Sequence, residues 1–320
     1  MKMLKNILMA RRIIKDKINK TPLILAKDIL NERESDVYFK SEVSQKTGSF
    51  KIRGVLNRLH YLTPSEKKRG IIALSVGSHA LSLSFVASKL NIPLTIVMPK
   101  IVPQNKVKLI KSYGANVVLA NRFFSRCKEI QNKHKLTMIH PFDDLMIIAG
   151  QGTIGLEIIE ELSNVNMVFI PIGGGGLISG IAAAIKLKKP EVKIIGVEPI
   201  GAPSMFKSIQ DNKIIHLNKY KTIADCLVAP CVGKHTFKYA KKYVDEFILV
   251  SDKEIIEALR KIWQISKIKV EPSAAVSLAA IIFKKIKIPQ GSKIVSVLTG
   301  GNISNEYFKR IISNNKNTYN

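Results

Sequence analysis

Lys51 stands in the segment Thr47-Gly48-Ser49-Phe50-Lys51-Ile52-Arg53-Gly54, between a bulky aromatic residue and a helix-forming run, directly after a Gly-Ser turn. Desolvation lowers the pKa of a lysine held in this way, and the free amine can then attack an aldehyde. One lysine carries little weight in a chain with 51 lysines and arginines. The interpretation therefore depends on other segments of the chain.

A run of four glycines, Gly173-Gly174-Gly175-Gly176, follows an apolar strand-like run and opens a predicted helix. The backbone N–H groups of such a loop can cradle a phosphate. A lysine that captures an aldehyde and a loop that binds a phosphate together indicate pyridoxal phosphate. A dinucleotide is the competing ligand, but the glycine spacing differs from the Rossmann fingerprint, and no ribose-binding acid follows at the required distance.

Three further segments lie between predicted strands and helices. Ser75-Val76-Gly77-Ser78-His79 presents helix-opening N–H groups that suit a substrate carboxylate, although alone it also fits a simple serine-capped turn. Val297–Asn302 runs from a strand into two glycines and forms another tight loop. The acidic pair in His140-Pro141-Phe142-Asp143-Asp144 fits a metal site or an acid–base pair, but such a pair before a helix more often caps it.

Apolar β-rich runs alternate with amphipathic helical runs, which predicts parallel sheets covered on both faces. The predicted strands are Val37–Lys40, Gly70–Val76, Leu94–Met98, Asn116–Leu119, Val168–Ile172, Val192–Val197 and Lys293–Leu298. The predicted helices are Ser49–Leu62, Ser78–Leu90, Pro103–Tyr113, Arg122–Lys135, Gly152–Leu162, Leu177–Leu187, Lys253–Ile268 and Pro272–Phe283. The strands form two clusters along the chain, so we expect an α/β protein of two three-layer domains with parallel sheets and a ligand in the cleft between them.

Composition narrows the class of protein. A chain of 320 residues that is 46% hydrophobic can bury a large core without disulfide or metal support. Cys127, Cys226 and Cys231 form no CxxC pair, and no apolar run is long enough for a signal segment or a membrane span. We therefore expect a cytoplasmic protein with no membrane partner.

The formal net charge of +27 raises the possibility of a nucleic-acid partner. However, the lysines are dispersed along the chain, which favours a solvated surface and no nucleic-acid partner.

Taken together, these segments resemble the fold-type II pyridoxal-phosphate enzymes of the tryptophan synthase β family, in the threonine/serine dehydratase and serine racemase branch. The resemblance extends from Thr21 to Asn302. It implies a discontinuous large cofactor-binding domain (residues 1–60 and 146–320) and a small substrate-binding domain (residues 61–145). Besides the segments quoted above, the motifs in the family's order are Gly150–Glu157, Thr222–Asp225 and Glu271–Ser273.

The resemblance implies roles for individual residues. Lys51 would hold the cofactor as a Schiff base and later shuttle the Cα proton, and Phe50 would pack against one face of the ring. Thr299 would face the pyridine nitrogen; a hydroxyl there leaves that nitrogen unprotonated and weakens the electron sink, which suits rapid β-elimination. The phosphate would be bound by the backbone amides of Gly173, Gly174, Gly175, Gly176 and Leu177. The substrate carboxylate would be held by Ser75, Gly77, Ser78 and His79.

The implied activity is that of a threonine/serine dehydratase, a carbon–nitrogen lyase. L-threonine would give 2-oxobutanoate and ammonia, and L-serine would give pyruvate and ammonia. One alternative within the family is a serine or amino-acid racemase, which accumulates D-serine. Another is a β-replacement synthase, which needs an added nucleophile such as sulfide. A degenerate, non-catalytic binder would hold the cofactor without turnover.

Three departures from the family pattern bear on these alternatives. Ser78 stands where an asparagine usually contacts the cofactor's ring oxygen, and the shorter serine needs a water to reach it. Val76 stands where racemases carry a serine that moves a proton, so racemisation is disfavoured. In the metal-binding branch two carboxylates bind the ion; Glu198 and the Ala202 carbonyl match, but Ser204 replaces the second acid, which weakens a Mg²⁺ or Ca²⁺ site.

Other residues receive structural interpretations. Cys226 stands where glycine is common, and we interpret it as a buried small hydrophobe. Glu271 is interpreted as a domain-packing or loop-ordering group, with a polar role in the active site as the alternative. The chain ends soon after its last predicted strand, so we expect no C-terminal regulatory domain. The family also implies a homo-oligomer.

Overall fold

The computed structural model describes residues 2–27, 29–30, 35–102 and 104–313. The strands of its larger sheet are β1 (Leu23–Leu25), β2 (Ser35–Ser41), β7 (Met167–Pro171), β8 (Lys193–Pro199), β9 (Glu246–Val250) and β10 (Ser292–Leu298). Their order across the sheet is β1-β2-β10-β7-β8-β9. All neighbouring pairs are parallel except β1 and β2, which are antiparallel.

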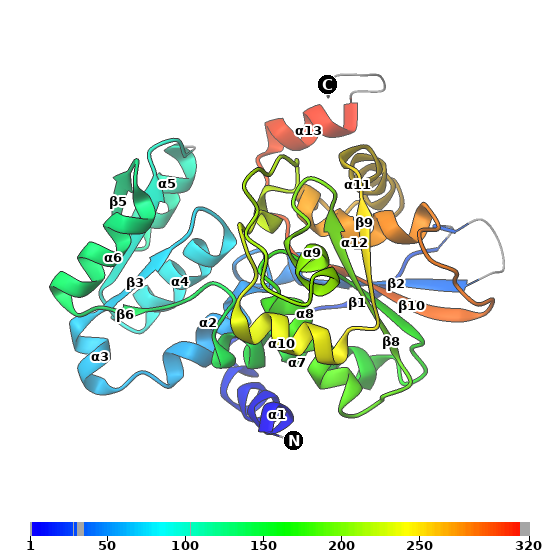
Figure 1. The fold of residues 1–320 in the computed structure, drawn as a ribbon, viewed down its shortest axis with the longest axis horizontal. Coiled ribbons are helices and arrows are strands. Elements are labelled where there is room, and N and C mark those ends of the chain that lie inside the picture. Colours follow the sequence, from blue (N-terminus) through cyan, green and yellow to red (C-terminus); the bar gives the residue numbers. More distant parts are fainter. Residues whose placement is uncertain (1, 28, 31–34, 103, 314–320) are drawn as a thin grey trace.

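The smaller sheet consists of β3 (Ile71–Leu74), β4 (Leu94–Pro99), β5 (Asn116–Ala120) and β6 (Thr137–Met138). Its strands are all parallel and run in the order β5-β4-β3-β6. Figure 1 shows this sheet and its helices as a lobe to the left of the larger sheet. The two sheets confirm the predicted α/β class with parallel strands. The domain limits stay a prediction, which the separation of the sheets supports.

Helices cover both faces of the larger sheet. They are α7 (Leu145–Glu161), α8 (Gly176–Lys186), α10 (Lys234–Tyr243), α11 (Asp252–Ser266) and α12 (Pro272–Ile282). Phe169 in β7 packs into a core with α11 and α12. Its neighbours Val168 and Ile170 pack into a second core with α7, α8 and α10. Successive side chains of a strand point to opposite faces, so the sheet becomes the middle of three layers.

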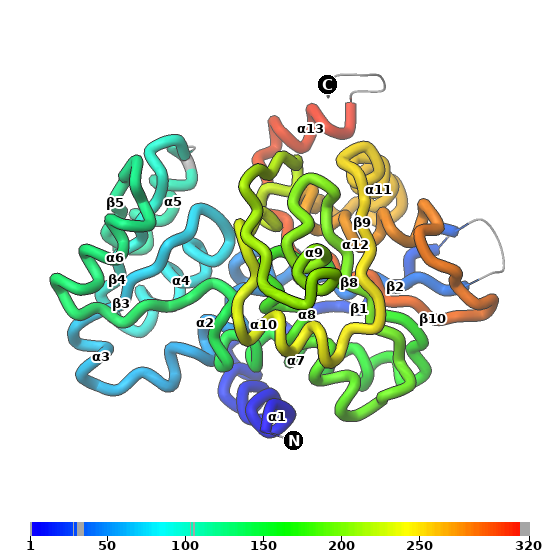
Figure 2. The backbone as a smooth tube through the Cα atoms, in the orientation of Figure 1, coloured from blue at the N-terminus to red at the C-terminus, as the bar shows by residue number. Residues whose placement is uncertain are grey.

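The smaller sheet is also covered on both faces. Other helices and turns of the chain are α1 (Lys2–Ile14), α2 (Lys51–His60), α3 (Pro64–Arg69), α4 (Ser78–Lys89), α5 (Gln104–Ser112), α6 (Phe123–His134), α9 (Ser204–Gln210), α13 (Asn305–Ser313), η1 (Glu42–Ser44) and η2 (Asp225–Leu227). Ile71 packs with α2, α4 and α5, whereas Ile72 faces α6. Since α2 also packs against α7, it contacts both lobes. In Figure 2, α1 lies at the bottom of the view and α13 at the top.

A pair of glycines holds α2 close to α7. A Cβ atom on Gly150 would lie 2.6 Å from the Gly54 Cα atom and 2.6 Å from the Arg53 carbonyl oxygen. A side chain at either glycine would therefore force the two helix backbones apart. Because α2 begins at Lys51, this contact fixes the position of the lysine relative to the larger sheet.

The helix predicted at Gly152–Leu162 begins seven residues earlier, at Leu145. The Asp144 carboxylate accepts hydrogen bonds from the N–H groups of Met146 and Ile147, at 2.7 and 3.1 Å, and this cap starts the helix. The glycines that favour a loop on this segment instead serve close helix packing. Local sequence alone predicts neither the cap nor the packing partner.

Several short or basic elements have no clear sequence signal. They are β1, β6, β9, α1, α3, α9, α10 and α13. In α1 the buried residues Met3, Ile7, Ala10 and Ile14 recur at helical spacing, but basic residues between them weaken the pattern. The polar composition of the residues after Ile312 predicts a frayed end, but positions 314–320 lie outside the described residues.

Candidate active site

Lys51 is the first residue of α2, and its amine points toward the segment that precedes α7. The Nζ atom donates to the Pro141 carbonyl oxygen at 3.0 Å and lies 5.0 Å from the centroid of the Phe50 ring. Burial lowers the pKa of Lys51 to about 8, and nearby Cys226 and Glu271 oppose the shift. More of this amine is therefore unprotonated at neutral pH than in an ordinary lysine.

The glycine loop joins β7 to α8, as the sequence predicts. Gly175 has a φ of +89°, and a Cβ atom there would lie 2.9 Å from the Thr236 Cβ atom. A Cβ atom on Gly174 would lie 2.2 Å from the Phe142 ring. Phe142 directly follows Pro141, the hydrogen-bond partner of Lys51. The loop and the lysine thus belong to one site.

Thr299, at the end of β10, lies beside the lysine segment. Its carbonyl oxygen accepts a hydrogen bond from the Phe50 N–H at 3.1 Å, and Ser49 forms a β-bridge with Gly300. Thr299 is buried, yet within the described part of the chain its hydroxyl makes no hydrogen bond. That hydroxyl is available to a ligand at the Lys51 site.

Asn302 links the lysine segment to the loop that begins α4. Its Nδ2 group donates to the Thr47 carbonyl oxygen at 3.0 Å and to the Ser78 Oγ atom at 2.9 Å. The amide thereby uses both of its hydrogens. The Ser78 hydroxyl keeps its own hydrogen for a further acceptor.

The loop at residues 75–79 turns through Gly77 into α4. The Ser75 Oγ atom accepts a hydrogen bond from the Ala80 N–H at 3.2 Å. The N–H groups of Ser78 and His79 belong to the first turn of the helix, where no intrahelical acceptor exists. Such free amides can bind an anion, and the role predicted for them with a substrate carboxylate stays a prediction.

The His79 ring takes no part in charge recognition. Its Nε2 atom lies 3.3 Å from the Ile139 carbonyl oxygen, and its Nδ1 atom is buried without a partner in the described structure. Burial, with a smaller effect of Lys51, lowers the pKa of His79 to about 3. The ring is therefore neutral, and the residue can contribute to carboxylate binding only through its backbone N–H.

The acidic pair caps helices, the arrangement that the sequence favours, and His140 hydrogen-bonds to the same segment. The His140 Nδ1 atom accepts a hydrogen bond from the Asp143 N–H at 2.8 Å. Asp144 caps α7, and the Asp143 carboxylate accepts from the N–H groups at the start of α10, those of Lys234, His235 and Thr236. Among the described residues, no group of three or more His, Cys, Asp or Glu side chains is placed to hold a metal ion.

A buried ion cluster, formed by Arg53, Glu42, Glu157 and Lys40, lies on the other side of α2. Arg53 donates to both oxygens of Glu42 at 2.8 Å and to Glu157 at 2.9 Å. The Lys40 Nζ atom lies 2.8 Å from Glu157. Burial alone would lower the pKa of Arg53, but the two carboxylates raise it. Every member of the cluster is therefore paired, as buried charges must be.

A family model described as pyridoxal-phosphate dependent enzyme matches residues 14–300. This chain belongs to that family. It is 40% identical over 314 residues to the L-threonine ammonia-lyase of Thermotoga maritima, a match that covers 97% of this chain and 78% of the relative.

Solved structures of other pyridoxal-phosphate enzymes superpose on most of the chain. A threonine deaminase isoform from Solanum lycopersicum is 34% identical, with a TM-score of 0.90, and the match covers 97% of this chain and 91% of that one. A serine racemase from Dictyostelium discoideum is 37% identical, with a TM-score of 0.86, and the match covers 94% and 98%. The two structures carry different activities on one fold, so fold alone does not select the reaction.

The residues at the Lys51 site fit pyridoxal phosphate. The lysine supplies an amine of lowered pKa, and the four glycines carry no side chains of their own over the backbone amides of the loop. The Thr299 hydroxyl, buried and without a hydrogen bond in the described structure, would suit a neutral ring nitrogen. These features match an aldehyde, a phosphate and a pyridine nitrogen, which are three of the polar groups of the cofactor.

Glu198, predicted as a possible metal ligand, forms hydrogen bonds within the protein. Its carboxylate accepts hydrogen bonds from the N–H groups of Met205 and Phe206 at the start of α9, at 2.9 and 2.7 Å. Burial raises the pKa of Glu198 to about 8, although these amides oppose the shift. The Glu198 and Ala202 metal site stays a prediction.

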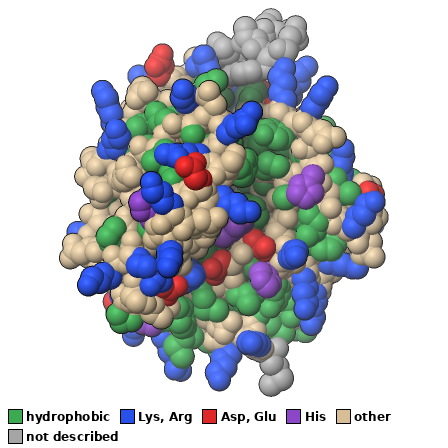
Figure 3. Space-filling model, turned by 60° about the vertical axis from the view of Figure 1, so that its left-hand side comes forward, with side chains coloured by type: hydrophobic (Ala, Val, Ile, Leu, Met, Phe, Trp, Pro, Cys, Tyr) green, Lys and Arg blue, Asp and Glu red, His purple; other side chains and the backbone are tan. Residues whose placement is uncertain are grey.

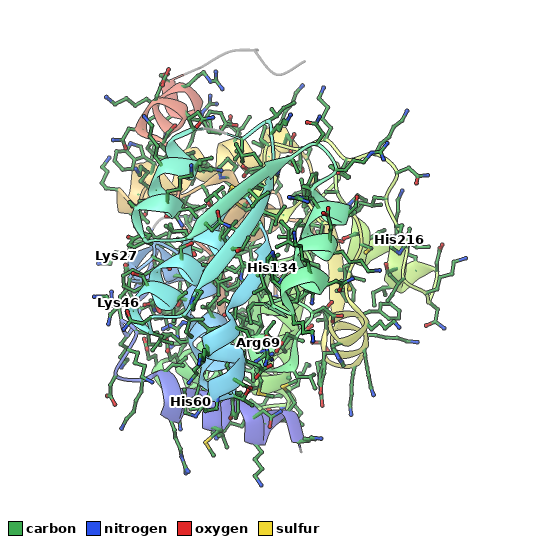
Figure 4. All side chains as sticks on the ribbon, turned by 90° about the vertical axis from the view of Figure 1, so that its left-hand side faces the viewer. Lys27, Lys46, His60, Arg69, His134 and His216 are labelled. Atoms are coloured by element: carbon green, nitrogen blue, oxygen red, sulfur yellow. The ribbon has the colours of Figure 1, made fainter. Side chains whose placement is uncertain are left out.

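The positive charge of the chain is spread over its surface. Figure 3 shows lysines and arginines across the whole visible face rather than in one patch. Figure 4 shows exposed basic side chains that project from different parts of the molecule: Lys27, Lys46, His60, Arg69, His134 and His216. In the described parts of the chain, no helix is both long enough and apolar enough to cross a membrane.

Three contacts at the site have no signal in the local sequence. They are the Phe142 ring against the glycine loop, the Asn302 amide on Ser78, and the Cys226 thiol beside Glu271. The prediction that Cys226 is a buried small hydrophobe is wrong, because the residue is exposed to solvent. Each contact joins segments far apart in the chain, so only the fold brings them together.

Proposed function

We propose that this protein is a pyridoxal-phosphate-dependent ammonia-lyase that converts L-threonine to 2-oxobutanoate and ammonia, and L-serine to pyruvate and ammonia. The observation that carries the proposal is the surroundings of Lys51. Its amine has a lowered pKa, and the glycine loop, Thr299 and the α4 loop all approach its segment. The likeness to threonine ammonia-lyases supports the choice of substrate.

In this proposal, different residues bind the cofactor, orient the substrate and remove its Cα proton. When bound, pyridoxal phosphate supplies an electron sink conjugated to the Cα atom of the amino acid. The amides of the glycine loop bind the phosphate, and the Ser78 and His79 amides bind the substrate carboxylate. The carboxylate contact orients the Cα–H bond toward Lys51, whose free amine removes the proton as a general base.

Two side chains favour elimination over racemisation. The Thr299 hydroxyl cannot protonate the pyridine nitrogen, so negative charge at Cα is poorly stabilised and loss of the β-hydroxyl is favoured over reprotonation. Val76 lies in the α4 loop with an apolar side chain that is 42% exposed. Valine carries no transferable proton, so this position cannot return a proton to the opposite face of the substrate.

The test is product analysis of the purified protein with pyridoxal phosphate and either L-threonine or L-serine. We expect 2-oxobutanoate or pyruvate to form together with an equal amount of ammonia, and D-serine to remain a minor product. D-serine that accumulates faster than pyruvate would support a racemase instead. Product that appears only with added sulfide would support a β-replacement synthase.

A separate outcome distinguishes a degenerate binder. If the protein takes up pyridoxal phosphate with a visible absorption band, but neither amino acid changes the band or yields product, the site binds the cofactor without turnover. Val76→Ser provides a matched variant for the racemase question. It adds a hydroxyl at the position that lacks one and should raise D-serine relative to pyruvate, while pyruvate remains the main product.

A further inference from the structure

Cys226 lies at the Lys51 site in the short turn η2, and its side chain reaches across to the α4 loop. The Sγ atom lies 3.7 Å from the place that a Cβ atom on Gly77 would take. Its backbone N–H donates to the Ser273 Oγ atom at 3.2 Å, which anchors the turn to the start of α12. The thiol is therefore held directly beside the loop proposed to bind the substrate carboxylate.

Glu271 holds the thiol from the other side. The Cys226 Sγ atom lies 3.7 Å from the Glu271 Oε2 atom, the only hydrogen-bond contact of this carboxyl group within the described residues. Glu271 is 5% exposed, and its backbone N–H donates to the Gly300 carbonyl oxygen at 3.1 Å, next to Thr299. A buried carboxyl group with a single weak donor therefore lies beside the thiol, at the start of α12.

The thiol stays protonated in this position. Its burial among neighbouring groups raises the pKa of Cys226 well above 9, with Glu271 and Asp225 adding to the shift, although the residue as a whole remains exposed. The side chain thus presents a neutral, largely apolar surface at the site. Cys226 and Glu271 are also the two groups that influence the pKa of the Lys51 amine.

We propose that Cys226, held by Glu271 over Gly77, limits the size of the amino-acid side chain that the enzyme accepts. The inference rests on the proposed function, because the loop at Gly77 is where the substrate carboxylate binds in that proposal. The part of the substrate nearest to this carboxylate is the Cα atom and its side chain. A sulfur atom beside the loop leaves room for small 3-hydroxy amino acids and excludes longer ones.

The first test locates the thiol without relying on turnover. The holoenzyme is treated with methyl methanethiosulfonate, and labelling of each cysteine is followed by mass spectrometry with and without saturating L-alanine, which has no β-leaving group. We expect the amino acid to slow labelling of Cys226 by about tenfold or more and to leave Cys231 unchanged. Cys231, which is partly exposed, is the internal control.

The visible band of the cofactor separates two failures in this test. If L-alanine shifts the band but does not protect Cys226, the size-limit proposal is overturned while the proposed function stands. If L-alanine leaves both the band and the labelling unchanged, amino-acid binding at this site fails, and both proposals fall.

The second test measures specificity. One methylene in an apolar pocket is worth roughly 10–200-fold in kcat/KM. We therefore expect Cys226→Gly to raise kcat/KM for 3-hydroxynorvaline relative to L-threonine by about tenfold, and Cys226→Val to lower the ratio of L-threonine to L-serine. Cys231→Ala is the matched control and should change neither ratio. Variants that keep their cofactor band and melting temperature but leave both ratios within about twofold of the wild type would contradict the proposal.

Discussion

Buried ionisable groups lie on both sides of the start of α2. On one side they form ion pairs, and on the other they are poorly paired. In the buried ion cluster, Arg53 and Lys40 each contact carboxylates directly. At the Lys51 site, Lys51 meets one carbonyl oxygen and Glu271 meets one thiol, and both have pKa values shifted toward their neutral forms. Paired charges keep their charge and fix the backbone, whereas poorly paired groups are left able to exchange protons.

The comparison explains why both regions occur next to each other. A lysine of lowered pKa is useful only if it stays in one place, and α2 is short, with no side-chain cap at its N-terminus. Two contacts hold this helix in place. Arg53 donates hydrogen bonds to Glu42 and Glu157, and Gly54 packs closely against Gly150. Four measurements test whether the buried ion cluster stabilises the fold while the Lys51 site carries out the reaction.

The largest effect is expected from Lys51→Ala. Loss of the general base should lower kcat for L-threonine by about 10²–10⁴-fold or more, because proton transfer from Cα then has no positioned acceptor. The melting temperature without cofactor should change little, since the lysine makes one hydrogen bond to the protein. Steady-state kinetics with a thermal melt of the apoprotein checks both statements, and wild-type-like turnover would remove Lys51 from the reaction.

Arg53→Met, in contrast to Lys51→Ala, should mainly lower the stability of the fold. It leaves the buried Glu42 carboxylate without a cationic partner and Glu157 with Lys40 alone, which costs about 3–5 kcal/mol in the free energy of unfolding. Denaturant unfolding measures the loss, and Arg58→Met, which breaks the less buried pair with Asp144, is the matched control. Equal losses in the two variants would show that the buried ion cluster has no special role.

Gly175→Ala tests the phosphate loop with smaller expected effects. The residue has a φ of +89°, and the added Cβ atom would lie 2.9 Å from the Thr236 Cβ atom. We expect a stability loss of about 1–3 kcal/mol and at least tenfold weaker binding of pyridoxal phosphate. Gly291→Ala is the control, because its φ is +75° but no atom lies within 4 Å. It should show the backbone cost alone, and weaker cofactor binding in this variant too would contradict a local role of Gly175.

The smallest effect is a pH dependence. The pKa of Lys51 is lowered to about 8, so the neutral amine rises tenfold per pH unit below that value and levels off above it. The rate of cofactor capture by the apoprotein should follow this curve, rather than rise until pH 10.5. Stopped-flow absorbance from pH 6 to 10 measures it; a rate that still rises steeply above pH 9 would mean that Lys51 is not desolvated.

Local sequence predicts the parts of this site that depend on backbone chemistry. A lysine after a Gly-Ser turn, four consecutive glycines and a strand that runs into Thr299 and two glycines each carry a physical signal. The buried central strands follow from their apolar runs. The edge strand β9 and the basic helix α10 give no such signal, because their patterns resemble a solvated surface. Family resemblance, rather than spacing, points to the α4 loop.

Contacts between side chains from distant segments cannot be predicted from local sequence patterns. The contact of Phe142 with Gly174 and that of Asn302 with Ser78 join residues from different segments of the chain. Cys226 shows the limit most clearly, because its neighbours in sequence favour a buried residue, while its neighbours in space are Gly77 and Glu271. Only the arrangement of η2, α4 and α12 places the thiol at the site.

The most direct test of the central claim is to find which lysine binds the cofactor. The holoenzyme is reduced with borohydride, digested, and the peptides that carry the pyridoxyl group are identified by mass spectrometry. The account predicts one modified residue, Lys51, and loss of that modification when L-threonine is added before the reductant. Modification spread over the surface lysines, or none at Lys51, would contradict it.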